Sequence, residues 1–195
     1  MATTVAPRTD QAERDHWRFS LEDYHRMIDA GILKGDDRVE LIDGEILKMS
    51  PIGSRHATSV RELNTRFTIA LGDRAIVSPQ NPVSVRPRSE PQPDIAILAA
   101  RKHKYRKAHP EPGDVLLMIE VADSSVRFDR NRKLPLYASS GIVETWLVDL
   151  VHNVVVVATE PTADGYTNIV EHKPGATIAP AAFPDITVDV AELLR

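Results

Sequence analysis

The stretch DVLLMIEVADSSVRFDRNRKLPLYASSGIVETWLVDL, residues 114–150, decides the fold. Its first part, 114–121, is almost continuously apolar up to Glu120, which is typical of a strand buried on both faces of a sheet. Residues 124–141 then carry a helical pattern, and 143–150 form another apolar, strand-like run. Pro135 lacks an amide hydrogen, so the helix either kinks there or begins in earnest at Leu134 to Pro135. We expect a central strand that leads directly into a helix.

The flanking sequence extends this α/β pattern. Residues 38–49, RVELIDGEILKM, predict a β-hairpin because Asp43-Gly44 favours a type I′ turn. A helix is expected after Ser20, with Asp23 as its capping partner, and a second helix over 54–71, ended by Gly72. Further β-like runs lie at 74–78, 82–87, 94–98, 153–159 and 166–173, and a short helix is expected from about Asp189. We predict an α/β fold with helices on both faces of a sheet.

Composition limits the possible functions. The chain has 195 residues, a formal net charge of -4 and no cysteine, so any metal must be held by oxygen or histidine. Residues 1–16 are predicted to be a disordered leader and 17–195 a single domain. No apolar stretch suits a signal peptide or a membrane span, so we expect a cytoplasmic protein. The densest basic run, RKHKYRK at 101–107, is either a solvated loop or a phosphate contact.

Three carboxylates stand where an ionised group is costly unless it is paired or bound to a metal. Asp94 opens an apolar strand, Glu120 closes one, and Glu40 interrupts the first strand of the hairpin. Each has an ordinary explanation too: a turn aspartate after Pro93, a strand end at the solvent boundary, and a solvated hairpin face. Together they favour an oxygen-rich pocket for Mg²⁺ or Mn²⁺, in which a metal-activated water would attack a phosphodiester.

Lys133 is the candidate base beside these acids. Asp129, Lys133 and Tyr137 follow at intervals of four, so in a helix they share one face, and that helix follows the strand of Glu120. The same spacing also fits a surface ion pair between Asp129 and Lys133, worth only ~0.3 to 0.5 kcal/mol. His56 follows a proline and glycine loop, where it either contacts substrate or is a plain surface histidine.

Six segments resemble a known family in their order and spacing. They are RVELIDGEI (38–46), SPIGSRH (50–56), PDIAIL (93–98), EVADS (120–124), DRNRKLPLY (129–137) and GIVETWLVD (141–149). The chain is similar, from about Trp17 to Leu194, to the Uma2 family of proposed endonucleases, also called DUF820. Two positions depart from the family pattern, Val126 in place of threonine and Thr145 in place of tyrosine, and neither is a presumed ligand.

The resemblance implies a restriction-endonuclease-like core of the PD-(D/E)xK superfamily, a mixed central β-sheet flanked by helices. It implies Asp94 and Glu120 as metal ligands, together with the carbonyl of Val121, and Glu40 as an additional acid. The position two residues after Glu120 is apolar in this chain, so the resemblance places the catalytic lysine at Lys133. The implied cofactor is Mg²⁺ or Mn²⁺.

The expected activity is metal-dependent cleavage of nucleic acid, with DNA as the partner and a homodimer as a possible way to cut two strands. The candidate substrate contacts are His56, Arg127, Lys102 and Lys104. Two other functions remain open: a non-enzymatic module that binds nucleic acid or protein on the same fold, and a hydrolase of a smaller phosphodiester.

Overall fold

The computed structural model describes residues 16–34, 36–102 and 105–194, so almost all of the expected leader lies outside the described residues. The helices are α1 (Leu21–Asp29), α2 (Ser54–Leu71), α3 (Val126–Phe128), α4 (Leu134–Ser139) and α5 (Val190–Leu193), with single turns η1 (Gly72–Arg74), η2 (Pro112–Asp114) and η3 (Asp129–Lys133). The strands are β1 (Val39–Ile42), β2 (Glu45–Lys48), β3 (Ala75–Pro79), β4 (Ile95–Ala99), β5 (Val115–Ala122), β6 (Glu144–Asp149), β7 (Val154–Thr162), β8 (Gly165–His172), β9 (Thr177–Ile178) and β10 (Val188–Asp189). None of the helices in these ranges is long and apolar enough to cross a bilayer.

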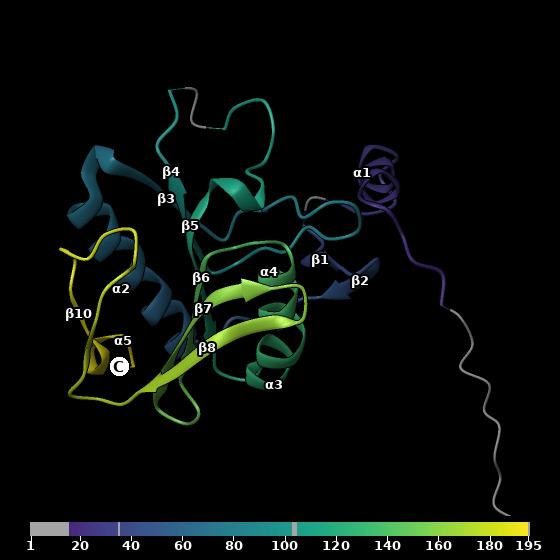
Figure 1. Ribbon diagram of the computed structural model, residues 1–195. Coiled ribbons are helices and arrows are strands. Elements are labelled where there is room, and N and C mark those ends of the chain that lie inside the picture. The colour runs from purple at the N-terminus through teal and green to yellow at the C-terminus, as the bar shows by residue number, and fades with distance from the viewer. Residues whose placement is uncertain (1–15, 35, 103–104, 195) are drawn as a thin grey trace, which may run out of the picture.

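The centre of the molecule is a six-stranded sheet in the order β3-β4-β5-β6-β7-β8 (Figure 1). Strands β5 and β6 pair in parallel, whereas the other neighbours are antiparallel. Parallel strands need a crossover connection, and here the helical segment α3–η3–α4 supplies it. The expected α/β fold with a mixed sheet is therefore confirmed.

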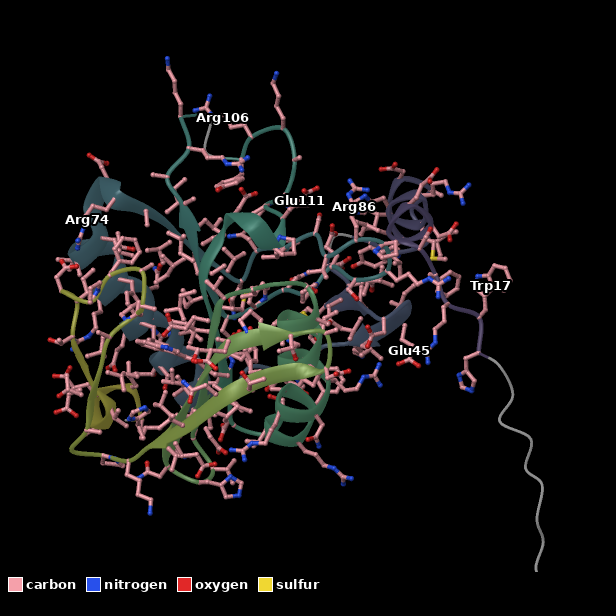
Figure 2. All side chains as sticks on the ribbon, in the orientation of Figure 1. Trp17, Glu45, Arg74, Arg86, Arg106 and Glu111 are labelled. Atoms are coloured by element: carbon pink, nitrogen blue, oxygen red, sulfur yellow. The ribbon has the colours of Figure 1, made fainter. Side chains whose placement is uncertain are left out.

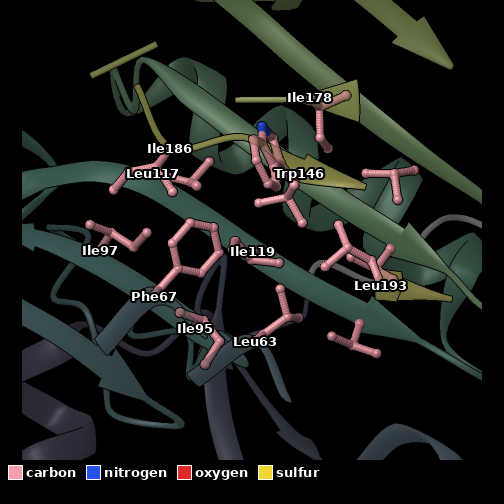
Figure 3. Close-up of a cluster of buried hydrophobic side chains, with 14 of the residues drawn as sticks. Leu63, Phe67, Ile95, Ile97, Leu117, Ile119, Trp146, Ile178, Ile186 and Leu193 are labelled. Carbon is pink, nitrogen blue, oxygen red and sulfur yellow. The ribbon is translucent and has the colours of Figure 1, made fainter. Parts of the chain in front are cut away.

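Helices cover both faces of this sheet. Helix α2 packs on one face, where Leu63 and Phe67 meet Ile119 and Trp146 (Figure 3). The rings of Phe67 and Trp146 lie 6.1 Å apart at a tilt of 56°, a favourable aromatic geometry. Helix α4 lies on the opposite face, with Tyr137 fully buried there (Figure 1). Each such side chain stabilises the fold by about 1.5–3 kcal/mol relative to an exposed one.

The hairpin β1–β2 has the expected turn, with φ of 49° at Asp43 and 79° at Gly44. A Cβ at Gly44 would lie 2.8 Å from the Cβ of Arg18, so glycine is required there for space as well as for φ. Leu41 packs towards α1 and Ile42 towards the central sheet, and both are fully buried. Both faces of β1 are thus covered, which also buries Glu40, the residue directly before Leu41.

The expected strand at 82–87 is wrong. Val83 and Val85 are buried, as their alternation suggests, but the segment forms only an isolated bridge from Val85 to Ser89. Its amides donate instead to the carbonyls of Pro91, Pro110 and Ser89. The prolines of this region carry no amide hydrogen, so a continuous ladder cannot form.

The helix after β5 runs from Val126 to Ser139 with a widened, π-helical turn at its centre. There the amide of Leu134 donates to the carbonyl of Asp129, five residues back. The widened turn ends at Lys133, two residues before Pro135, whose ring would clash with an ordinary helix interior. The regular α-helix α4 begins at Leu134 with Pro135 in its first turn, as one of the two expected alternatives states, and the wider turn before it continues the helix back to Val126.

Candidate active site

The acids predicted from the sequence meet at one end of the central sheet. Strands β4 and β5 pair Ile95 with Ile119, so Asp94 and Glu120 face each other one residue further along. Residues opposed in this way have Cβ atoms about 4.5–5.5 Å apart. Asp94 is 9% exposed, Glu120 3% and Glu40, from the hairpin, 5%. Glu40 therefore does not lie on a solvated face of the hairpin, and Glu120 does not lie at the solvent boundary, so both of these ordinary explanations are wrong.

Lys133 lies between two of these acids. Its Nζ is 3.1 Å from Glu40 Oε2 and 3.2 Å from Glu120 Oε1, and the residue is only 5% exposed. The surface ion pair with Asp129 is therefore wrong. Asp129 is itself buried and accepts a hydrogen bond of 2.5 Å from Ser125 Oγ. The π-helical turn carries both residues into the same buried cluster.

Each of the three acids has one anchored carboxylate oxygen. Asp94 Oδ2 accepts from the Val121 amide at 2.9 Å and lies 3.0 Å from His56 Nε2. Glu120 Oε1 accepts from Tyr137 at 2.5 Å as well as from Lys133. Glu40 Oε2 forms an ion pair with Lys133 and accepts a hydrogen bond of 3.3 Å from the backbone amide of Gln92.

The second oxygen of each acid remains available. Within the ranges that the structure describes, no side chain or amide donates a hydrogen bond to Glu40 Oε1 or Glu120 Oε2, and Asp94 Oδ1 has only a long hydrogen bond of 3.4 Å from Gln80. The free oxygens are the ones that can reach a ligand, because the others are held by the fold.

Burial and mutual repulsion set the charges of this cluster. The pKa of Glu120 is raised to about 8, first by burial and then by Asp129, Asp94 and Glu40, against the opposing effect of Lys133. Burial also raises the pKa of Asp129 to about 6. For Lys133 burial disfavours the charge, but Glu120, Glu40 and Asp129 outweigh it and raise its pKa. Lys133 therefore keeps its positive charge. Its single ammonium does not balance all of the carboxylates around it, so the cluster has an excess of negative charge.

His56 lies in the first turn of α2, and its Nε2 forms a hydrogen bond with Asp94. The hydrogen bond to Asp94 raises the pKa of this imidazole, and burial opposes the rise. Its Nδ1 is buried without a hydrogen-bond partner among the described residues. His56 is thus a partly buried member of the cluster, and the plain surface histidine is wrong as an explanation.

A cavity of about 520 Å³ opens over the cluster. The acids and Lys133 line it together with the hairpin, the loop 49–53 and the loop 123–125. A volume of this size fits a nucleotide-sized ligand.

The donor set fits a hard divalent cation. No three or more His, Asp or Glu side chains in the described chain stand close enough together to enclose a metal ion by themselves. Mg²⁺ does not require such a cage, because it usually keeps several waters and binds through one or two carboxylates. The free oxygens of Asp94 and Glu120 and the excess of negative charge suit that mode.

Two of the other predicted substrate contacts, Arg127 and Lys102, lie away from the cavity. Arg127 is exposed on the far side of α3 and lines a different surface hollow. Lys102 follows β4, at the end opposite to Asp94, and does not line the cavity. Figure 2 shows Arg106, on the same loop, at the top of the molecule and far from Glu45 on the hairpin. Lys104 lies outside the described residues.

Sequence reasoning missed two groups that shape the site. The hydroxyl of Tyr137 donates to Glu120, a role that its spacing of four from Lys133 could have suggested. The backbone amide of Gln92 donates to Glu40 and leaves no trace in side-chain patterns.

The comparisons with known proteins agree with this architecture. The model of the Uma2 family, described as "putative restriction endonuclease", matches residues 21–191. The fold is similar to the crystal structure of a "putative nuclease belonging to DUF820" from Anabaena variabilis, with a TM-score of 0.70 at 14% identity over 90% of this chain and 97% of that one. No curated protein matches in sequence. The family model spans most of the chain, which therefore belongs to the Uma2 family.

Proposed function

We propose that the protein is a metal-dependent nuclease of one domain, residues 17–195, that hydrolyses phosphodiester bonds in DNA with Mg²⁺ or Mn²⁺. The free oxygens of Asp94 and Glu120, with the carbonyl of Val121, would hold the ion. Such an ion lowers the pKa of a coordinated water and offsets negative charge on phosphoryl oxygens.

The side chains of the cluster orient the reacting groups. An ammonium has three donors, and Lys133 gives one each to Glu40 and Glu120. Its third N–H is left for the attacking water or a phosphoryl oxygen. Glu40 holds this ammonium in place, and its free Oε1 can accept a proton from the water. Tyr137 and His56 fix the other two carboxylates, which limits the loss of conformational entropy on binding.

The observation that carries this proposal is the contact of Lys133 with both Glu40 and Glu120. Burying a lysine costs desolvation energy, and ion pairs with buried carboxylates offset that cost without a clear net gain in stability. The position of Lys133 therefore calls for a functional reason. A lysine beside carboxylates that can hold a metal ion suits phosphodiester hydrolysis, because it can orient water or offset phosphoryl charge, and this supports an enzyme over a binding module.

The test is cleavage of supercoiled plasmid in Mg²⁺ by the parent and by the near-isosteric variants Asp94→Asn and Glu120→Gln. We expect both variants to fall to the level of the parent in EDTA. Glu22→Gln, which removes an exposed acid on α1, is the matched control and should cut like the parent. Equal nicking by the parent and the two site variants would refute the proposal, and tight plasmid binding without cleavage would favour the binding module.

A further inference from the structure

One edge of the central sheet is a long strand with a free outer side. Strand β8 is the last of the six strands and pairs with β7 on its inner side (Figure 1). Among the described residues, the backbone groups of 166–172 form no hydrogen bond outside the β7–β8 ladder. Roughly half of the amides and carbonyls of an edge strand point away from its neighbour. Strand β8 therefore presents a row of unused donors and acceptors.

The opposite edge of the sheet is protected, whereas β8 is not. Strand β3 has five residues and ends in Pro79, and both a short edge strand and a proline hinder further pairing. Strand β8 has eight residues, with neither proline nor lysine among them. Its Ile169 is 55% exposed and its Val170 is 42% exposed. A long edge with exposed apolar side chains is suited to pair with another strand.

The two exposed apolar side chains lie on opposite faces of the sheet. Ile169 pairs with Ala158, which belongs to the core beneath α4, and Val170 pairs with Val157, which packs against the core beneath α2. A strand added at this edge would therefore cover apolar surface on both faces as well as the backbone groups.

The charges at the two ends of β8 are opposite in sign. Asp164 directly precedes the strand and Lys173 directly follows it, and both are exposed. No oppositely charged group of the described chain lies within 4.0 Å of either, whereas Glu171 inside the strand is paired with Arg130 at 3.0 Å. Two antiparallel β8 strands would bring Lys173 of each copy to Asp164 of the other. This complementarity favours a second copy of the chain as the partner.

We propose that two copies of the chain associate through antiparallel β8 strands, around a two-fold axis at Ile169, so that their two six-stranded sheets become continuous. A two-fold axis perpendicular to the sheet keeps every side chain on its own face, so one residue of β8 must face its own counterpart. With Ile169 in that place, two exposed isoleucines meet, and Glu171 faces Thr167 of the second copy. An axis at Val170 would instead set Ile169 against Glu171.

This interface leaves the active cavity open. None of the described residues that line the cavity belongs to β8, and β6 and β7 separate β8 from the strand that bears Glu120. The inference is therefore independent of the proposed function, and neither of the two measurements below requires cleavage of a substrate.

Sedimentation equilibrium over a series of concentrations tests the association. The variants are Ile169→Lys and, as the matched control, Ile69→Lys, which places the same charge at an isoleucine of α2 that is 78% exposed. We expect the parent and the control to sediment at twice the mass of one chain. Ile169→Lys should raise the dissociation constant of the dimer by about tenfold or more, because two like charges would meet on the axis.

Disulfide cross-linking tests the register with milder substitutions. The chain contains no cysteine, so a single introduced thiol reports on one position. Ile169→Cys should form a covalent dimer under mild oxidation, because the Cβ atoms of opposed residues lie about 4.5–5.5 Å apart, close to the geometry of a disulfide. In Val170→Cys the two thiols would be diagonal neighbours, roughly 7–8 Å apart, and should cross-link far less.

A parent that sediments as a single chain throughout the concentration series would overturn the inference. A dimer that Ile169→Lys leaves as tight as the parent's would place the interface elsewhere in the molecule. Cross-linking that is as efficient in Val170→Cys as in Ile169→Cys would refute the axis at Ile169.

Discussion

Replacing Lys133 by methionine should destabilise the protein, and the loss should grow with pH. Removing one partner of a buried ion pair costs about 3–5 kcal/mol, because the other charge stays buried. Here Glu40 and Glu120 both lose their ammonium. Glu120 can take a proton, since its pKa is already raised to about 8, and this limits the loss near neutral pH. We expect a loss of about 3 kcal/mol at pH 7, or about 6–12 °C in Tm for a chain of this size.

The sign of the pH dependence follows from Glu120. Its folded-state pKa lies above the ordinary value of 4.5, so the folded chain holds more protons than the unfolded chain between these values. The contribution of Glu120 to the free energy of unfolding of the parent therefore falls as pH rises from 4.5 to about 8 and then levels off. Without Lys133 the pKa is higher still, so the decline continues above pH 8, by up to ~1.4 kcal/mol per pH unit.

Urea unfolding at pH 6, 7, 8 and 9 measures this effect. Arg132→Met is the matched control, because it removes the adjacent charge, whose ion pairs with Asp43 and Glu45 are exposed or half-exposed. It should cost less than about 1 kcal/mol at every pH. A penalty for Lys133→Met that is as small as the control's and does not widen between pH 7 and pH 9 would refute the reasoning.

Three further outcomes follow. Tyr137→Phe should weaken Mn²⁺ binding in calorimetry by about tenfold or more, because Glu120 loses a fixed donor, whereas Tyr24→Phe should bind like the parent; equal affinities would contradict this. Mn²⁺ should raise the Tm of the parent more at pH 8 than at pH 6, because the ion competes with the proton on Glu120, and an equal rise at both values, or the same rise in Asp94→Asn, would count against the site. Gly44→Ala should cost about 1–3 kcal/mol more than Gly31→Ala in urea unfolding, since both glycines have positive φ but only Gly44 is crowded; equal costs would exclude the crowding.

Patterns of neighbouring residues correctly predicted the turns and helices that depend mainly on local sequence. The Asp43-Gly44 turn and helix 54–71 needed only backbone preferences and apolar spacing, and both are confirmed. Apolar alternation failed at 82–87, because burial and strand pairing are different properties. Val83 is buried there without a ladder.

The site depended on contacts that spacing cannot resolve. The interval from Asp129 to Lys133 fitted both an exposed ion pair and a buried lysine, and the π-helical turn that buries them is a feature of backbone geometry. The basic run 101–107 was prominent by density alone. Its distance from Asp94 follows from the direction of β4, which places the two at opposite ends of that strand.

The anchoring of Glu120 has a consequence for the order of synthesis. Both of its donors, Lys133 and Tyr137, come later in the chain than the strand that bears it, and Glu40 comes from a hairpin made much earlier. During synthesis, Glu40 and Asp94 are therefore made before Lys133 and Tyr137, the two residues that hold Glu120 in place. Contacts between such distant segments form late in folding, because long loops must close first. If the proposed function holds, a partly synthesised chain would bind the metal ion only weakly and would not cleave DNA.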